Sequence, residues 1–320
     1  MGREVRKYKM NDYDKYHLVP KERSFVSSRE EVNMHSMLYG LYPFMSSPMK
    51  GVSGSKLVIE MGRNNCLGIL HRFEVFSVRE KMVRDVAKAN VPFGIAIGMG
   101  GNQEEFQMEL SYAKFAIERG AILICLDVAN GYIPQHEDRG KQLREEFPDI
   151  ALMSGNVVDY SGAEYLYKSG FDFVRVGIGG GSNCSTRAIT GVGRNQLEAV
   201  QDCSHSGAWV VSDGGITQVG NAVKSFAFGA DYCMMGTAFA WSLEAENDGE
   251  LSGMASLKNH IVNNKTIKSI EGFTTEIDNS KKLPLKEIID QFIWGTRSAC
   301  TYLNCKDYKE LSSKALKTNQ

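Results

Sequence analysis

The stretch Ala121-Ile122-Leu123-Ile124-Cys125-Leu126 is a run of apolar residues without polar alternation. A strand with one face in water alternates apolar and polar side chains, whereas a strand of a parallel sheet is covered on both faces and is apolar throughout. The run therefore predicts a fully buried strand of a parallel sheet and places the chain among the α/β proteins.

The segments on the amino-terminal side of this run have the spacing of amphipathic helices. Residues Asn102 to Arg119 repeat apolar side chains at helical intervals and stop at Gly120, a residue type that commonly ends helices. Residues Ser77 to Asn90 show a similar stripe and open with Ser77 and Glu80 at the spacing of a capping box. Helices are thus expected to alternate with strands.

Seven further apolar runs extend this alternation over residues 42 to 239. Eight strands about 27 residues apart, each followed by a helix or a long loop, match a (β/α)8 TIM barrel, and a doubly wound sheet is the alternative. The eight strand candidates are Tyr42–Met49, Cys66–Phe73, Pro92–Met99, Ala121–Ala129, Asp149–Val157, Phe171–Gly179, Trp209–Ile216 and Asp231–Phe239.

Polar residues and glycines gather directly after these runs. Because the loops at the carboxyl ends of the strands form the active site of such barrels, this placement agrees with the barrel prediction. The motifs are Ser46-Ser47-Pro48-Met49, His71-Arg72, Gly98-Met99-Gly100-Gly101, Asp127-Val128-Ala129-Asn130-Gly131, Gly155-Asn156, Gly177 to Ser182, Ser212 to Gly215 and Met235-Gly236-Thr237.

The alternation ends near residue 240. A polar stretch follows from Glu244 to Lys268, and Leu283 to Trp294 has the spacing of one more amphipathic helix before a lysine-rich tail. We find no linker, so we expect one TIM-barrel domain over residues 1–320 with an amino-terminal extension. Its strands would occupy about 42–239, and a flap and a carboxyl-terminal helical segment would occupy about 240–311.

The charge balance excludes a global attraction to nucleic acid or to an anionic membrane. The chain of 320 residues has 37 Lys plus Arg against 38 Asp plus Glu, a formal net charge of −1. Seven sparse cysteines without metal-ligand spacing favour a reducing, cytoplasmic compartment. We find no signal peptide or membrane-spanning segment in the sequence. The expected ligands are therefore small molecules that are bound locally.

Glycine-rich turns follow the last two predicted strands, the usual position of a phosphate site in this fold. Ser212-Asp213-Gly214-Gly215 and Gly236-Thr237 would let backbone N–H groups approach phosphate oxygens, and Ser182 can add a hydroxyl. Tight turns without a ligand are the alternative. A dinucleotide-binding fold is disfavoured, because neither Gly177-x-Gly179 nor Gly191-x-Gly193 completes G-x-G-x-x-G.

Cys184 is the best candidate nucleophile. It lies in a polar, glycine-rich loop, Gly179 to Arg187, that is unsuited to a packing cysteine, and Arg187 is close enough in sequence to favour a thiolate. Cys125 and Cys233 fall within predicted strands and are expected in the core. Among the six histidines only His71 follows a strand, where a structural role explains it as well as a functional one.

The segment Val176 to Arg187, followed by Thr190-Gly191-Val192-Gly193, resembles the catalytic loop of the IMP dehydrogenase and GMP reductase family. The resemblance runs from about residue 18 to about Leu311 and so covers nearly the whole chain. Further matching motifs, in the family's order, are Val19-Pro20-Lys21, Ser28 to Val32, Ser212 to Ile216, Gly229 to Asp231, Met235-Gly236, Gly253-Met254 and Glu271-Gly272.

The resemblance implies a covalent mechanism. In the family the loop cysteine attacks carbon 2 of a purine nucleotide, so Cys184 would be the nucleophile, while Thr186 and Glu271 would handle the proton of departing ammonia or entering water. The resemblance implies a potassium ion on the backbone carbonyls of Gly179, Gly181, Cys184 and Arg187. The implied nucleotide-binding residues are Ser182, Asp213, Gly214, Gly215, Gly236, Thr237, Gly253, Met254, Lys268 and Gly272. The implied cofactor-binding residues are Arg72, Asp127, Asn130, Gly131, Asn156, Ser298 and Tyr302.

Two features favour the reductase branch. Dehydrogenases of the family have two CBS modules after the second strand and a flap with an Arg-Tyr pair whose Arg acts as a base. Here only 18 residues separate Arg72 from Val91, and no Arg or Tyr lies between Tyr232 and Arg297. Gly295 to Tyr302 resembles the reductase carboxyl-terminal signature, in which two side chains contact the cofactor of a neighbouring subunit. Those side chains would be Ser298 and Tyr302, and a homotetramer is the family expectation.

The resemblance therefore implies the NADPH-dependent conversion of GMP to IMP with release of ammonia. A dehydrogenase without CBS modules that oxidises IMP to XMP with NAD, and a catalytically idle nucleotide-binding barrel, are the alternatives. Flavin-binding barrels share the phosphate turn but do not need the Cys184 loop. The departures from the family are Lys50, usually Asp, Arg72, usually Lys, Gly180, usually Pro, and Ile270, usually Ser.

Overall fold

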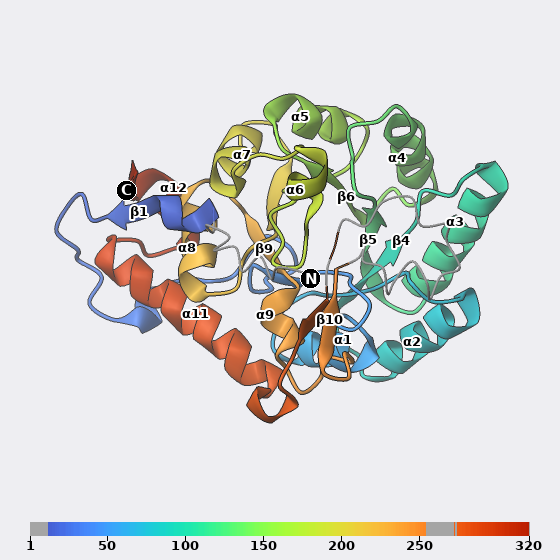
Figure 1. Cartoon of the computed structure of the whole chain (residues 1–320), viewed down its shortest axis with the longest axis horizontal. Helices are drawn as coiled ribbons and strands as arrows, with labels where there is room; N and C mark the ends of the chain where they lie inside the picture. Colours follow the sequence, from blue (N-terminus) through green and yellow to red (C-terminus); the bar gives the residue numbers. More distant parts are fainter. Residues whose placement is uncertain (1–11, 254–271, 273, 320) are drawn as a thin grey trace, which may run out of the picture.

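A ring of eight parallel strands forms the centre of the molecule, with helices around it (Figure 1). This computed structural model describes residues 12–253, 272 and 274–319. The strand order is β2-β9-β8-β7-β6-β5-β4-β3. The backbone N–H of Leu67, just before β3, donates to the carbonyl of Phe44 in β2 at 3.3 Å, and the N–H of Ser46 donates to the carbonyl of Leu67 at 3.1 Å. These bonds nearly close the ring, so the predicted barrel is confirmed and the doubly wound sheet is wrong.

Each barrel strand lies inside the apolar run that predicted it, because the ends of the runs continue into loops. The barrel strands are β2 (Phe44–Ser46), β3 (Gly68–Leu70), β4 (Phe93–Ile97), β5 (Ala121–Asp127), β6 (Ala151–Val157), β7 (Phe173–Val176), β8 (Trp209–Asp213) and β9 (Tyr232–Met235). The main helices are α1 (Ser55–Arg63), α2 (Phe76–Lys88), α3 (Gln103–Ile117), α4 (Gln135–Glu146), α5 (Tyr160–Lys168), α6 (Thr186–Thr190), α7 (Gln196–Cys203), α8 (Val219–Ala227), α9 (Thr237–Ala240), α11 (Leu285–Tyr302) and α12 (Leu311–Lys314).

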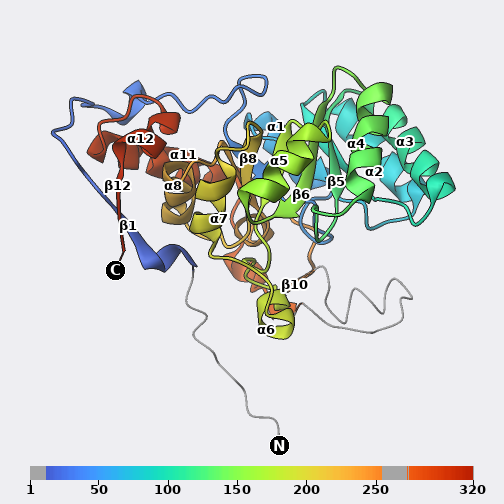
Figure 2. The same cartoon turned by 90° about the horizontal axis from the view of Figure 1, so that it is seen from above.

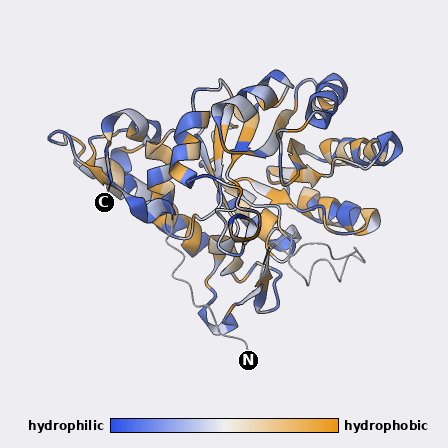
Figure 3. Cartoon of the chain, turned by 45° about the horizontal axis from the view of Figure 1, so that its top comes forward, coloured by the Kyte–Doolittle hydropathy of each residue, from blue (hydrophilic) through white to orange (hydrophobic). Residues whose placement is uncertain are grey.

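Strand β5 is apolar from Ala121 to Leu126 because both of its faces are buried there. Leu123 and Cys125 belong to the cluster that fills the barrel, whereas Ile124 and Leu126 belong to the larger cluster between strands and helices. All four side chains are at most 1% exposed. Figure 3 shows the same division, with hydrophobic strands at the centre and hydrophilic outer turns on the helices. The two apolar layers fix the barrel and place its loops at the ends.

The helix ends follow the sequence prediction only in part. Asn102, the first residue of the segment predicted as a helix, caps α3 by accepting the N–H of Glu105 at 2.9 Å. The capping box at Ser77 is wrong, since α2 already begins at Phe76 and Ser77 lies inside its first turn. Helix α11 runs to Tyr302, well beyond the predicted end at Trp294.

Two short antiparallel sheets flank the barrel. Strand β1 (Tyr16–Val19) pairs with β12 (Leu316–Asn319), so the two ends of the described chain lie together. Strand β10 (Glu250–Ser252) pairs with β11 (Thr274–Glu276), and β10 lies on the same side of the barrel as α6 (Figure 2). In the described part of the chain, no helix is both long and apolar enough to cross a membrane.

Candidate active site

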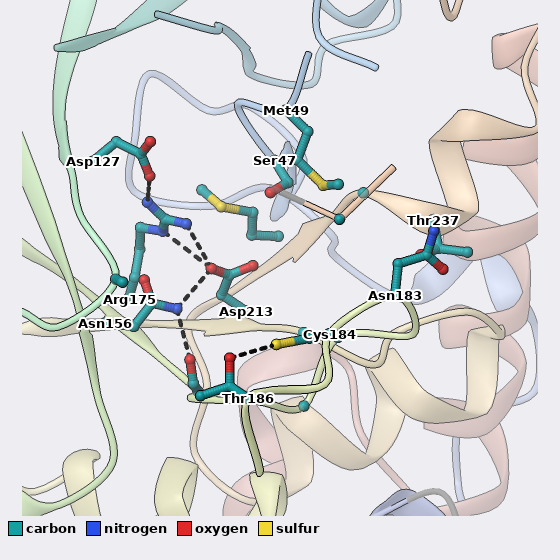
Figure 4. A pocket seen from close by; sticks show the side chains of 18 of the residues that line it. Ser47, Met49, Asp127, Asn156, Arg175, Asn183, Cys184, Thr186, Asp213 and Thr237 are labelled. Atoms are coloured by element: carbon teal, nitrogen blue, oxygen red, sulfur yellow. Dashed lines mark hydrogen bonds and ion pairs between the residues drawn. The ribbon is translucent and has the colours of Figure 1, made fainter. Parts of the chain in front are cut away.

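A cavity of about 820 Å³ opens at the carboxyl ends of the barrel strands. This volume lies within the range of small-molecule sites. Residues from the carboxyl ends of seven strands, or from the loops that follow them, line it (Figure 4). The predicted site residues that line the cavity are Arg72, Asp127, Asn156, Gly179, Gly181, Ser182, Cys184, Thr186, Asp213, Gly214, Gly215, Gly236, Thr237 and Gly253.

Other predicted site residues lie elsewhere. Arg187, Asn130, Gly131, Ser298 and Tyr302 are not among the residues that line the cavity. Gly272 forms an antiparallel bridge with Cys184 and so lies beside the loop. The predicted residues Met254, Lys268 and Glu271, and the family departure at Ile270, lie outside the described residues.

Cys184 presents the one partly exposed thiol among the seven cysteines, all of which are described. Its S–H donates to the hydroxyl oxygen of Thr186 at 3.1 Å, and both side chains face the cavity (Figure 4). The other six cysteines are buried, and burial raises the pKa of the Cys125 and Cys203 thiols to about 12. Cys184 is therefore the cysteine that a ligand in the cavity can reach.

Asn183 fixes the loop next to this thiol. Its side chain is 6% exposed, and its amide nitrogen donates to the carbonyl of Leu251 in β10 at 2.7 Å. The Thr275 hydroxyl in β11 donates to the Asn183 amide oxygen at 3.0 Å. The β10–β11 sheet is thus docked on the cysteine loop. This role was not predictable from the sequence, because the bonds form between distant segments.

The glycine turns of the sequence prediction converge at the cavity. Gly214 and Gly215 have φ of +117° and +76°, which favour glycine. A Cβ atom on Gly214 would lie 3.2 Å from the backbone nitrogen of Gly181, and one on Gly215 would lie 3.0 Å from the carbonyl of Gly180. The turn after β8 therefore packs directly on the loop after β7, and their backbone N–H groups can serve an anion.

Arg175 joins two carboxylates at the floor of the cavity. Its guanidinium donates to Asp127 Oδ1 at 2.6 Å and, through two nitrogens, to Asp213 Oδ2 at 3.1 and 2.8 Å. Arg72 donates to Asp127 Oδ2 at 3.1 Å, and the amide of Asn156 donates to Asp213 Oδ2 at 2.9 Å. Three of these residues were predicted as cofactor-binding and one as nucleotide-binding. Arg175 was missed, although a charged residue inside an otherwise apolar strand was the available signal.

The network sets the charges of the floor. Burial raises the pKa of Asp127, but Arg175 and Arg72 outweigh it and hold that pKa below its ordinary value. Burial also disfavours the charged guanidinium, yet the carboxylates of Asp213 and Asp127, with Cys125, raise the pKa of Arg175 well above its usual range. Oδ2 of Asp213 is saturated, whereas Oδ1 has no donor among the described residues and can accept ligand hydroxyls.

An ion pair lies at the mouth of the cavity. Lys50, a departure that the sequence comparison with the family predicted, has its ammonium 2.7 Å from Glu74 Oε1, and both residues line the cavity. Each side chain is about one-third exposed. The charge that Lys50 introduces is therefore compensated by Glu74.

His71 has a structural role in the loop that follows β3. It is 5% exposed, its Nδ1 accepts the N–H of Phe73 at 3.2 Å, and it does not line the cavity. Burial lowers its pKa to about 4, so the ring is neutral at physiological pH.

Arg187 does not serve the thiol as the sequence interpretation supposed. Its guanidinium pairs with Asp12 at 2.6 Å and donates to the carbonyls of Ile178 at 3.0 Å and of Arg194. Of these acceptors, Ile178 lines the cavity, whereas Asp12 and Arg194 do not. Arg187 is thus part of the scaffold of the loop.

The fold and the site together define a class of protein. It is a (β/α)8 barrel in which a reachable cysteine, a glycine turn of the anion-binding type and an acceptor carboxylate surround one cavity. These groups are suited to covalent catalysis on an anionic substrate. The family model described as "IMP dehydrogenase / GMP reductase domain" matches residues 11–319. The chain therefore belongs to the IMP dehydrogenase and GMP reductase family, whose members are oxidoreductases of purine nucleotides that use nicotinamide cofactors.

Relatives of similar length support this membership. GMP reductase 1 of Mus musculus is 30% identical over 93% of this chain and 92% of its own length. The GMP reductase of Serratia proteamaculans is 31% identical over 93% and 91%, and that of Photobacterium profundum is 29% identical over 92% and 90%. The likeness extends over the barrel and the carboxyl-terminal segment alike.

Proposed function

We propose that the chain is an NADPH-dependent GMP reductase that converts GMP to IMP and ammonia in purine salvage. The observation that supports this most is the partly exposed Cys184 thiol, which faces the cavity beside the converging glycine turns. The names of the relatives, which match more than nine-tenths of the chain, support the reductase over the dehydrogenase.

The nucleotide would occupy the side of the cavity formed after β7, β8 and β9. Backbone N–H groups of Gly214, Gly215 and Gly236, with the hydroxyls of Ser182 and Thr237, would hold the phosphate. The free oxygen of Asp213 would accept the ribose hydroxyls. Gly253 and Gly272, next to the cysteine loop, would approach the base, together with Met254 and Lys268, which lie outside the described residues.

The cysteine would act as the nucleophile at carbon 2 of the purine. Its sulfur bonds to carbon 2, the bond from carbon 2 to the amino group breaks, and the thiol proton passes through Thr186 and Glu271 to the amino group, which leaves as ammonia. Bound NADPH would supply the hydride for carbon 2, so that the carbon–sulfur bond breaks, the Cys184 thiolate is released and IMP leaves. The Thr186 hydroxyl lies 3.1 Å from the sulfur, close enough to serve a leaving group there.

The cofactor would bind beside the nucleotide, at the part of the cavity that Arg72, Asp127 and Asn156 line. Asn130 and Gly131 would act through the shape of their loop, because the Gly131 N–H donates to the Asn156 carbonyl at 2.9 Å.

Ser298 and Tyr302 would complete the cofactor site of a neighbouring subunit in a homotetramer. This arrangement agrees with two facts: Tyr302 is 68% exposed, and neither residue lines the cavity of its own chain.

The loop carbonyls fit a potassium ion in their chemistry. The ion would bind the carbonyl oxygens of Gly179, Gly181, Cys184 and Arg187. The carbonyl of Arg187 accepts the backbone N–H of Gly191 at 3.1 Å, and a carbonyl oxygen has a second lone pair for a cation. Potassium bound there would order the backbone that carries the thiol.

The loss of NADPH absorbance on mixing with GMP and potassium tests the proposal. Turnover that produces IMP and ammonia and that disappears in Cys184→Ser is expected. Turnover only with IMP and NAD would identify a dehydrogenase. GMP binding without turnover in either assay would identify a nucleotide-binding barrel, and either result would overturn the proposal.

A further inference from the structure

A short helix at the amino-terminal end of the described chain bonds to Arg187, the last residue of the cysteine loop, and to the start of α7. This 3-10 helix, η1 (Asp12–Lys15), packs beside α7, far from it in sequence (Figure 1). Oδ2 of Asp12 accepts the Arg187 guanidinium at 2.6 Å and the backbone N–H of Gln196 at 2.8 Å. The Asp12 carbonyl accepts the amide of Asn195 at 3.3 Å. One carboxylate therefore joins the start of α6 to the start of α7.

Arg187 transmits this contact to the cysteine loop. Besides Asp12, its guanidinium holds the carbonyl of Ile178, at the beginning of the loop. Its aliphatic stem packs against Gly179 and Gly193: a Cβ atom on Gly193 would lie 2.6 Å from the Arg187 Cγ, and one on Gly179 would also collide with that carbon. The Arg187 side chain thus contacts the beginning of the loop that carries Cys184, and Arg187 itself is the last residue of that loop.

The Asp12–Arg187 pair is shielded enough to hold a geometry. The Asp12 side chain is 19% exposed and the Arg187 side chain is 26% exposed. Ion pairs that contribute little to stability are those whose side chains are exposed to solvent. The next residue, Tyr13, is fully buried and donates its hydroxyl to the carbonyl of Gly214 at 3.0 Å. Helix η1 therefore touches the cysteine loop and the adjoining glycine turn at the same time.

We propose that Asp12 is a positioning residue, which sets the place of the Cys184 thiol by holding Arg187. The inference rests on the proposed function only in taking Cys184 as the nucleophile. Asp12 touches neither the cavity nor the thiol, so its effect passes through Arg187. Loss of its charge releases the guanidinium, and the loop that ends at Arg187 gains freedom.

The variant Asp12→Asn tests this role, with Asp14→Asn as its matched control. Asp14 lies in the same helix, is exposed, and loses the same charge. The first readout is the rate at which iodoacetamide alkylates Cys184, located by peptide mass. This rate reports on the loop because the other six cysteines are buried. We expect it to rise about 3- to 10-fold in Asp12→Asn and to stay unchanged in Asp14→Asn.

The second readout separates positioning from binding. We expect kcat for GMP to fall by about 10- to 100-fold while KM changes by less than about 2-fold, because misplacement of a reacting atom costs rate rather than affinity. Arg187→Lys keeps the charge but loses the forked contact, and we expect it to give a similar loss. If Asp12 acts through Arg187, the double variant Asp12→Asn, Arg187→Lys should lose no more kcat than the more impaired of the two single variants.

Two outcomes would overturn the proposal. One is an Asp12→Asn protein whose alkylation rate and kcat both match those of Asp14→Asn. The other is a double variant in which the two losses multiply. A wild-type protein without GMP turnover would refute the proposed function instead, and the alkylation rates would still decide the role of Asp12. A melting temperature near that of the wild type shows in each case that the variant is folded.

Discussion

Replacement of Arg175 by Met should expose how strongly the floor of the cavity depends on one guanidinium. Arg175 is 6% exposed and lies between Asp127 and Asp213, whose side chains are only 13% and 12% exposed. Met fills much of the volume but leaves two carboxylates buried without their shared cation. Removing one partner of a buried ion pair costs about 3–5 kcal/mol, so we expect that loss in the free energy of unfolding at pH 7.

The pH dependence distinguishes this electrostatic cause from lost packing. In the wild type the pKa of Asp127 is below its ordinary value, so its stabilisation is present above about pH 4 and disappears as the pH falls through the folded pKa. In the variant, burial without Arg175 raises the pKa of this carboxyl, and protonation at mildly acidic pH relieves the penalty. The difference between the two proteins should therefore shrink from pH 7 to pH 5.

Urea denaturation at both pH values measures the difference directly. Arg84→Met is the control, because Arg84 pairs with Glu80 at 2.9 Å in a surface pair whose side chains are 49% and 38% exposed. It should cost no more than about 1 kcal/mol. An Arg175→Met penalty that is below about 1 kcal/mol, or that is equal at pH 7 and pH 5, would refute the reasoning.

Four further outcomes are expected. Thr186→Val removes the acceptor of the Cys184 thiol and should lower kcat for GMP by about 10-fold or more, with the melting temperature unchanged; an unaltered kcat would exclude a role in proton handling. Tyr13→Phe loses the bond to the Gly214 carbonyl and should cost about 0.5–1.5 kcal/mol in urea denaturation and weaken GMP binding in calorimetry, whereas Tyr16→Phe, which loses a bond to Glu198, should leave binding intact. Gly140→Ala, in α4, places a Cβ atom against the Ser169 carbonyl and should lower the free energy of unfolding by about 1–3 kcal/mol, whereas Gly220→Ala, in α8 with open space around it, should raise it by about 0.5 kcal/mol. A gain in stability for both variants would show that helix propensity outweighs the steric clash. Burial lowers the pKa of His136 to about 4, so its neutral ring stabilises the fold above about pH 6.5, and this contribution is lost as the pH falls toward 4. His136→Leu should therefore make the melting temperature less dependent on pH between these values, and an unchanged dependence would contradict this role of His136.

The barrel was predictable because its signal is local. A run such as Ala121 to Leu126 is apolar on both faces for the same reason that Leu123 and Ile124 lie in different core clusters. Helix ends were less predictable, since they depend on tertiary burial: Thr296 and Cys300 are fully buried, and they extend α11 past the expected end.

The site was predictable where a short motif specifies it. The loop around Cys184 and the turn at Asp213 both line the cavity that the strand ends form. Contacts between distant segments were not predictable, because nothing in the sequence near Arg175 or Asp12 indicates which residue each of them contacts. Arg187 shows the same limit: its nearness to Cys184 in sequence suggested that its charge favours a thiolate, but in the structure its guanidinium pairs with Asp12.

The mass of the chain, quenched in acid after mixing with GMP, tests the central claim most directly. A covalent bond between Cys184 and carbon 2 predicts a chain heavier by the mass of GMP less ammonia, with the addition on the peptide that contains Cys184 and none in Cys184→Ser. NADPH should discharge this species as IMP forms. Turnover of GMP without the addition, and undiminished in Cys184→Ser, would contradict the account.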